Sequence, residues 1–247
     1  MGSPLRTRTP TPELLRSRIR DLNLRLKGSS LELPVARLYR ELAGRGLVIR
    51  PLVYLGDEWF SPEGECAISI PFYLAHPRLL RLEQEMSGEV EGERPADFMK
   101  LLRHEAGHCF EHAYSLSGRR QWRGIFGDAR RAYRPETYRA DPATTDFVYN
   151  LERWYAQAHP CEDFAETFAV WLNPRSQWKK RYAQWPSALR KLQYIDRLAT
   201  ELAAAPTPRA ADEKHLDFRA DRMNMTLGSY YRRRKSENFD VRLVTRP

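Results

Sequence analysis

The chain has 247 residues, of which 42% are hydrophobic, so it can form a core as one large domain or as a medium domain with appendages. Its formal net charge of +9 favours acidic partners such as nucleic acid, acidic peptides or anionic lipid. No apolar run approaches the roughly 20 residues that span a bilayer, and the N-terminus lacks the apolar stretch of a signal peptide. We therefore expect a cytoplasmic protein that does not associate with membranes.

The three cysteines agree with a reducing compartment. Cys66, Cys109 and Cys161 form no Cys-x-x-Cys pair, and their odd number leaves one unpaired in any disulfide scheme. We interpret all three as structural residues.

The first third of the chain combines helices with a small sheet. Apolar residues at helical spacing, each run preceded by Thr or Ser, predict helices over 11–22 and 31–44. A β-branched, apolar run over 47–54 predicts a strand, and 66–73 predicts a second one. Pro71 lies inside the second strand and therefore indicates the edge of a sheet.

Helices dominate the remainder. A polar acidic loop from Gly88 to Pro95 separates two of them, and residues 117–145 lack a clear period, so we expect an ordered loop region with short helices. Pro160 suits the first turn of a helix. Helices are predicted over 78–86, 96–116, 146–157, 160–172 and 186–204.

Three parts are predicted along the chain: an N-terminal helical segment over 1–30, a central domain over 31–204 and a basic C-terminal extension over 205–247. The Ala-Pro-Thr-Pro stretch at 205–208 resembles a linker. The basic run 232–235 follows it, and we interpret this run as a solvated face or tail, because no recognised nucleic-acid-binding module accompanies it.

The chemistry is concentrated in His-Glu-Ala-Gly-His at 104–108. His104 and His108 are four residues apart in a helical stretch, so both imidazoles lie on one face and can reach one metal ion. Glu105 can then accept a proton from a water molecule whose pKa zinc lowers to about 7. Gly107 stands where a helix-favouring residue is expected, which suggests that backbone or substrate passes close by.

A catalytic zinc ion needs a third protein ligand. The extended motif with a third histidine would need histidine at 114, where this chain has Tyr114, and glycine at 111, where it has Glu111. His112 lies about 12 Å along the helix from His104, too far to share the ion. We therefore exclude a third histidine ligand and interpret His112 as a surface or supporting residue.

The segment 159–166 supplies glutamates instead. Glu162 and Glu166 fall on one helical face, so one can bind the metal while the other accepts a hydrogen bond from a ligand imidazole. Asp163 should point elsewhere. Alone, this stretch would be interpreted as an acidic helix start that complements the helix dipole. The His-Glu-Ala-Gly-His motif shifts the interpretation to a ligand.

These two stretches, His-Glu-Ala-Gly-His and Glu-Asp-Phe-Ala-Glu, resemble the gluzincin metallopeptidases, and within them the anthrax lethal factor family. The resemblance implies that Glu162 is the third zinc ligand and that Glu166 supports a ligand histidine. It also implies a catalytic tyrosine seven residues before the ligand glutamate, where this chain has Tyr155.

A longer resemblance, over about residues 31–200, links the stretches 70–76, 102–108 and 154–160 to bacterial proteins classed as zinc-binding metallopeptidases. It implies an α+β, zincin-like catalytic domain over 31–204, mostly helical, with a small N-terminal sheet. The edge strand of that sheet would precede the motif helix and pair with an extended peptide substrate.

We therefore expect a zinc metallopeptidase that holds Zn²⁺ through the two motif histidines and Glu162. Glu105 would be the general base. Tyr155 would stabilise the oxyanion, with His159 as a substitute donor or supporting residue.

Two alternatives remain open. The first is a zinc-binding protein without hydrolytic activity, in which Glu105 is incidental. The second is a nucleic-acid-associated regulatory protein that uses the basic run, although we do not expect nucleic acid as a partner. The expected partner is a peptide or protein substrate. If the net charge of the chain governs binding, this substrate is acidic. The sequence leaves the oligomeric state open.

Overall fold

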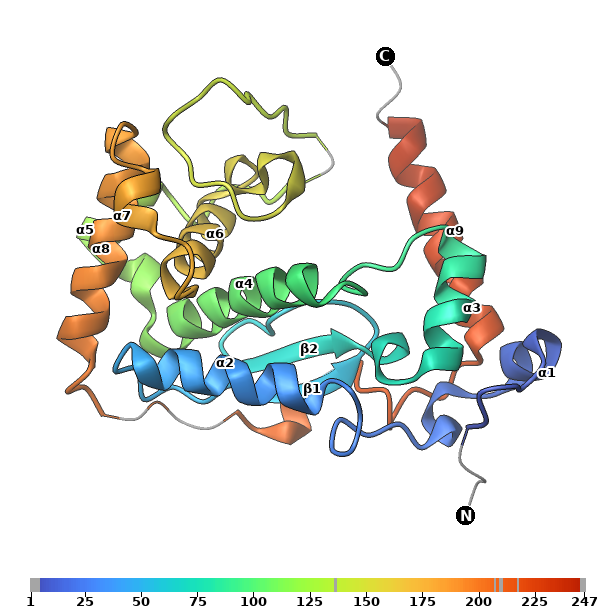
Figure 1. Cartoon of the computed structure of the whole chain (residues 1–247). Coiled ribbons are helices and arrows are strands. Elements are labelled where there is room, and N and C mark those ends of the chain that lie inside the picture. The colour runs from blue at the N-terminus through green and yellow to red at the C-terminus, as the bar shows by residue number, and fades with distance from the viewer. Residues whose placement is uncertain (1–4, 136, 207, 209–210, 217, 245–247) are drawn as a thin grey trace.

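A computed structural model describes residues 5–135, 137–206, 208, 211–216 and 218–244, with the backbone alone considered for 215 and 237–244. Helices surround a two-stranded parallel sheet (Figure 1). The α-helices are α1 (Thr11–Arg16), α2 (Glu32–Gly44), α3 (Pro77–Ser87), α4 (Pro95–Tyr114), α5 (Arg120–Phe126), α6 (Pro160–Leu172), α7 (Trp178–Arg181), α8 (Pro186–Leu202) and α9 (Leu227–Val244). The strands are β1 (Leu52–Gly56) and β2 (Ala67–Pro71), and the 3-10 helices are η1 (Ile19–Leu22), η2 (Phe72–Ala75), η3 (Leu116–Gly118), η4 (Glu152–Gln157) and η5 (Glu213–His215). A mostly helical α+β fold is thus confirmed.

The sheet is shorter than its sequence pattern suggests. β1 begins only at Leu52, whose amide donates to the Cys66 carbonyl at 2.9 Å, because the preceding Pro51 has no amide hydrogen to donate. β2 ends at Pro71 and continues into η2. On its outer side, the Ser69 amide donates to the Phe60 carbonyl at 2.8 Å. β2 therefore lies at the margin of the sheet, but a neighbouring segment of the same chain already occupies its outer edge at this point.

The core forms around α4. This helix packs against β2, α2 and α6, and its buried apolar residues include Phe98, Leu102 and Phe110. The ring of Phe110 lies 5.2 Å from that of Phe168 on α6, measured between centroids. The helices predicted over 31–44, 78–86, 96–116, 160–172 and 186–204 are confirmed as α2, α3, α4, α6 and α8, within a few residues at their ends. Long amphipathic stretches form where their period predicts, because the core covers their apolar faces.

The helix predicted over 11–22 is interrupted. Residues 11–16 form α1 and 19–22 form η1, with extended backbone at Ser17 between them. The Ile19 amide donates to the Met225 carbonyl at 3.1 Å, and the Ser17 carbonyl accepts from the Leu227 amide at 3.0 Å. Backbone groups that would continue the helix are thus bonded to the C-terminal part of the chain.

The helix predicted over 146–157 is also wrong. Only Glu152–Gln157 are helical, as the 3-10 helix η4, and Arg153 and Trp154 within it have φ angles of 58° and 54°. The Tyr149 amide donates to the Tyr182 hydroxyl, and the Leu151 amide donates to a side chain of α6. Hydrogen bonds to other elements therefore replace the helical ones.

Residues 211–216 and 218–236 return to the N-terminal half of the molecule. The Ala220 amide donates to the Leu55 carbonyl at 2.8 Å, and the Tyr230 hydroxyl donates to the Asp57 carbonyl at 2.9 Å. Figure 1 shows α9 beside α3, with its lower end near α1. Leu216, Met223, Leu227, Tyr230 and Tyr231 of this segment are buried.

The basic run on α9, residues 232–235, is only partly exposed to solvent. Arg233 pairs with Asp57 at 3.0 Å, and Arg234 pairs with Glu83 of α3 at 2.7 Å. The interpretation as a solvated face or tail is therefore wrong for these two residues, which pair with acidic side chains, whereas Arg232 and Lys235 are exposed.

None of the helices in the described ranges is long and apolar enough to cross a membrane.

We predict that Leu227→Ala destabilises the whole protein. Leu227 is fully buried where α9 meets α1, so its truncation should lower the free energy of unfolding by about 2–5 kcal/mol, measured by urea denaturation. Leu33→Ala on α2 is the matched control, because Leu33 is 77% exposed and should change stability by less than about 0.5 kcal/mol. Equal effects of the two changes would show that the C-terminal segment is not part of the core.

Candidate metal centre

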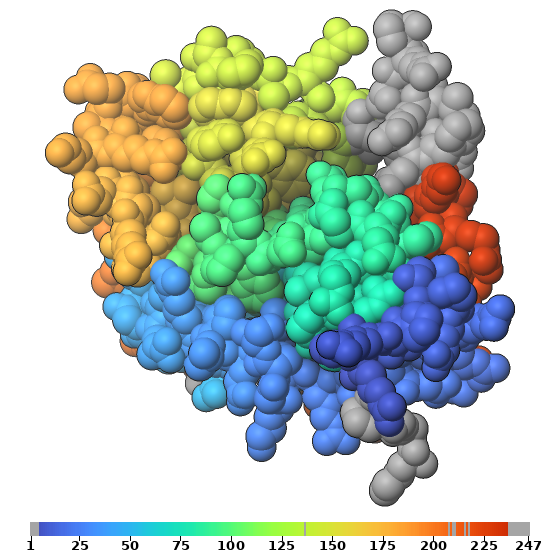
Figure 2. All heavy atoms as spheres, turned by 45° about the vertical axis from the view of Figure 1, so that its right-hand side comes forward, coloured from blue at the N-terminus to red at the C-terminus, as the bar shows by residue number. Residues whose placement is uncertain are grey.

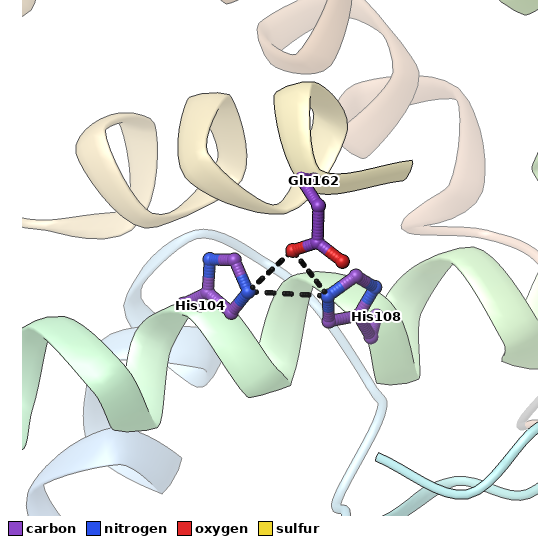
Figure 3. Close-up of side chains that lie close together, drawn as sticks. All are labelled: His104, His108 and Glu162. Atoms are coloured by element: carbon purple, nitrogen blue, oxygen red, sulfur yellow. Dashed lines mark hydrogen bonds and ion pairs between the residues drawn. The ribbon is translucent and has the colours of Figure 1, made fainter. Parts of the chain in front are cut away.

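Two helices bring three metal-binding side chains together. His104 and His108 lie one turn apart on α4, and Glu162 lies in the first turn of α6, which lies alongside α4 (Figure 3). The two Nε2 atoms are 3.1 Å apart. Oε2 of Glu162 lies 3.1 Å from the His104 Nε2 and 3.4 Å from the His108 Nε2. The ligand atoms thus converge on one point.

These distances fit zinc. Nitrogen and oxygen ligands about 2.0–2.2 Å from a tetrahedral zinc ion lie roughly 3.3 Å from one another, as the three atoms here do. The side chains of His104 and Glu162 are almost completely buried, and that of His108 is 16% exposed. Among the described residues, His104, His108 and Glu162 form the one group of three His, Cys, Asp or Glu side chains whose ligand atoms lie this close together.

The electrostatics of the group favour a positive charge at its centre. Burial lowers the pKa of His104, but hydrogen bonds to Glu162 and Glu166 outweigh burial and hold this pKa well above its ordinary value. Burial likewise raises the pKa of Glu162, but the two imidazoles outweigh it and hold that pKa well below the ordinary range. A bound cation would satisfy the same lone pairs.

The close approach of the helices depends on Gly107. A Cβ atom at this position would lie 2.8 Å from Cα and 3.1 Å from the carbonyl oxygen of Ala165 on α6. The sequence left backbone and substrate open as the close neighbour of Gly107, and the structure shows that it is the backbone of α6.

Glu166 lies one turn beyond Glu162, fully buried, and contacts the other side of His104. Its Oε1 accepts from the His104 Nδ1 at 2.8 Å, which directs Nε2 of that ring toward His108 and Glu162. Oε1 also accepts from the Asn150 side-chain amide, and Oε2 accepts from the Leu151 backbone amide, both at 2.8 Å. Asn150 carried no signal in the sequence, because it lies in the stretch 146–157 that is predicted to be a helix, and it reaches Glu166 only through the tertiary fold.

Glu105 lies in the same cleft as the three ligand atoms and is 5% exposed. Its Oε2 has no hydrogen-bond partner among the described residues. Burial raises the pKa of Glu105, and the charges of His104 and His108 offset this only in part. The carboxylate is therefore desolvated and available beside the ligands.

Tyr155 lies on η4 with its ring centroid 5.9 Å from that of His104. Its hydroxyl forms a hydrogen bond with the hydroxyl of Tyr133, and both residues line the cleft. Burial and the neighbouring Glu162 carboxylate raise the pKa of Tyr155, so the phenol keeps its proton at neutral pH. Tyr133 had no motif that could have marked it in the sequence.

His159 is the N-cap of α6 and lines the cleft. Its Nδ1 accepts from the Cys161 amide at 3.2 Å, and its Nε2 bonds the Arg131 carbonyl at 3.0 Å. Both ring nitrogens are thus engaged by backbone groups, and no bond to Glu162 or to the ligand imidazoles is seen. Its proposed role as a supporting residue or substitute donor stays a prediction.

The remaining candidates lie outside the cluster. His112 stacks on His108 at 6.3 Å between ring centroids and pairs with Glu111 at 3.5 Å. Asp163 points away from the centre, as predicted, and pairs with Lys191 at 2.7 Å. All three cysteines are free, and none joins the cluster.

The cluster opens into a cleft of about 1510 Å³. One wall is the connection between α5 and α6, and the facing wall is α3 with the loop that follows it, which Figure 2 shows above and below the hollow. Trp59 and Phe60 line the cleft on the sheet side, and Tyr231 and Arg234 of α9 line it at one end. Carboxylates outnumber Lys and Arg side chains along the lining by ten to six.

Residues 92–204, slightly less than half of the chain, match the model of a protein family described as "Putative zinc-binding metallo-peptidase". This stretch contains α4 and α6, and therefore all three ligand side chains. No curated protein and no solved structure matches the chain. The family match and the buried His-His-Glu cluster together support a zinc-binding metallopeptidase.

We predict that Gly107→Ala both destabilises the protein and weakens its zinc binding. The added methyl group forces α4 and α6 apart, which should cost about 1–3 kcal/mol in stability and separate the ligands carried by the two helices. Thermal unfolding and titration against a chromogenic zinc chelator measure the two effects.

Gly124→Ala is the matched control, because a Cβ on α5 at this position meets nothing within 4 Å. It should leave zinc affinity unchanged and stabilise the helix by up to about 1 kcal/mol. An unchanged zinc affinity in Gly107→Ala would contradict the dependence of the site on this contact.

Proposed function

We propose that this protein is a zinc-dependent metallopeptidase that hydrolyses a peptide or amide bond. One observation carries the proposal: the atoms of His104, His108 and Glu162 converge at zinc-ligand spacing beside the buried, unpartnered carboxylate oxygen of Glu105, in an open cleft. A purely structural zinc site is closed by four protein ligands, whereas this one offers three.

In this proposal His104, His108 and Glu162 hold the ion, and Glu166 fixes the orientation of His104. When bound, the zinc ion would act as a Lewis acid, which polarises the scissile carbonyl and lowers the pKa of the attacking water. Glu105 accepts the proton of the attacking water. The raised pKa of Glu105 suits this role, because a base is most effective when its pKa approaches the working pH.

Tyr155 acts as the neutral donor to the oxyanion that forms on the carbonyl. Its position over the His104 ring supports the assignment, and so does its raised pKa, which keeps a proton on the hydroxyl. A donor fixed in a water-poor site stabilises developing negative charge more than one in water does. We prefer Tyr155 to His159, whose ring nitrogens are both bonded to backbone groups.

The cleft favours neutral or basic peptides, in contrast to the acidic substrate suggested by the net charge of +9. Glu89, Glu91 and Glu93 are exposed on the loop between α3 and α4 and line the cleft. The cations nearby are largely engaged, since Arg94 pairs with Asp97 at 2.7 Å and Arg234, as described above, pairs with Glu83. The local field, which the substrate meets first, is set by these carboxylates.

Glu105→Gln distinguishes a peptidase from a protein that only binds zinc. We expect hydrolysis to fall by roughly 10²- to 10⁴-fold, because the base is lost, while the zinc content stays at the wild-type value. Cleavage of a peptide library and metal analysis of the purified variant measure both quantities. Glu201→Gln, on the exposed face of α8, is the control. Hydrolysis at the wild-type rate in Glu105→Gln would exclude the proposed mechanism.

The charge of the cleft predicts which peptides are cleaved. Library peptides with Lys or Arg near the scissile bond should have higher kcat/KM than those with Asp or Glu, and added salt should reduce the difference. Glu91→Gln should reduce it as well, whereas Glu201→Gln should not. A preference for acidic peptides would show that the net charge of the chain, and not the lining of the cleft, governs binding.

A further inference from the structure

The connection between α5 and α6, described for residues 127–135 and 137–159, contributes one wall of the cleft and is held at two points. The first is the Glu166 carboxylate, which accepts from Asn150 and Leu151, both at 2.8 Å. The same carboxylate accepts from His104. The C-terminal part of the connection, which leads into η4 and Tyr155, is therefore held by the group that orients a ligand histidine.

The second point is His159. Because its Nδ1 accepts from the Cys161 amide, its Nε2 carries the hydrogen and donates to the Arg131 carbonyl at 3.0 Å. The ring of Tyr133 packs edge-on against the His159 ring, with centroids 5.6 Å apart and planes at 86°. This contact orders the N-terminal part of the connection over the start of α6, although Tyr133 itself is 49% exposed.

Tyr133 and Tyr155 meet between these two points through their hydroxyl groups. Tyr155 follows two residues with left-handed backbone, and its hydroxyl stands at the end of a long side chain. The rings of His104 and Tyr138 contact its ring, and the contact at the hydroxyl restricts the direction of the hydroxyl group itself. If Tyr133 donates to the Tyr155 oxygen, the Tyr155 hydrogen stays free for a substrate oxygen.

We propose that Tyr133 is a positioning residue, which holds the Tyr155 hydroxyl toward the metal centre and is itself held by His159. The inference rests on the proposed function, in which Tyr155 is the oxyanion donor. It gives His159 a role that its bonds to backbone groups permit, since it acts through the connection rather than on the substrate.

The first test is a double-mutant cycle of Tyr133→Phe and Tyr155→Phe. Loss of one neutral hydrogen bond should lower kcat roughly 2- to 12-fold in Tyr133→Phe, with KM and zinc content unchanged. In the Tyr155→Phe background the same change should have no further effect, because there is no hydroxyl left to position. Tyr39→Phe on α2, which loses a hydroxyl bond to the Pro51 carbonyl outside the lining of the cleft, should leave kcat unchanged.

Two results would overturn the inference. An equal loss of kcat in both backgrounds would mean that Tyr133 acts without Tyr155. An unchanged kcat in Tyr133→Phe would mean that the hydroxyl contact does not position Tyr155. A higher kcat would mean that this contact competes with the substrate.

The second test separates the ring of His159 from its capping bond. His159→Asn keeps a side-chain acceptor for the Cys161 amide but loses the bond to Arg131 and the contact with Tyr133. His76 caps α3 in the same way, accepting from the Arg78 amide at 3.1 Å, and it too precedes a proline. We expect His159→Asn to lower kcat as Tyr133→Phe does and His76→Asn to leave it unchanged. Equal rates in the two histidine variants would refute the anchoring role.

A binding measurement keeps the inference apart from the proposed function. Affinity of the zinc-loaded protein for a peptide phosphonate, whose tetrahedral oxygens imitate the oxyanion, requires no turnover. Tyr133→Phe should raise the Kd in the wild-type background and not in Tyr155→Phe. If the wild-type protein cleaves no peptide, the proposed function fails. If the Kd is the same in Tyr133→Phe as in the wild type, the inference fails.

Discussion

The backbones of α4 and α6 meet at Gly107 and Ala165, and the candidate centre depends on this contact. A Cβ atom at position 107 would lie only 2.8 Å from the Ala165 Cα, so the helices would have to separate to make room for it. Because glycine allows the approach, the first turn of α6 lies directly over the histidines of α4. The buried Glu162 carboxylate then reaches two imidazoles at once. A glycine that weakens an isolated helix thus makes the pairing of two helices possible.

The two glutamates of α6 have different roles in the candidate site. Glu162 faces the ligand nitrogens, and Glu166, one turn later, binds the opposite nitrogen of His104. The second oxygen of Glu166 accepts from the Leu151 amide, so the segment that leads to Tyr155 shares its anchor with a ligand. Fully bonded buried carboxylates of this kind fix geometry, because any displacement leaves a charged group without partners.

Charge is distributed unevenly over the molecule. The chain carries a net charge of +9, yet the cleft contains an excess of carboxylates. The C-terminal segment brings Arg234 to the lining, but this arginine is paired with Glu83, and Arg233 is paired with Asp57. Net charge acts on distant partners, whereas a bound substrate meets only the groups that line its site.

The sequence by itself determined those features that depend only on residues close to one another along a helix. The spacing of His104 and His108, the spacing of Glu162 and Glu166, and the period of α2, α3, α4, α6 and α8 could all be predicted, because residues four apart share a face whatever surrounds them. The tertiary structure alone decided the break at Ser17, the left-handed turn at Arg153, the return of the C-terminal segment, and the contacts of Asn150 and Tyr133. Each of these depends on hydrogen bonds or packing between residues distant in the chain. Local periodicity contains no information about such partners, since only the packed fold brings them together.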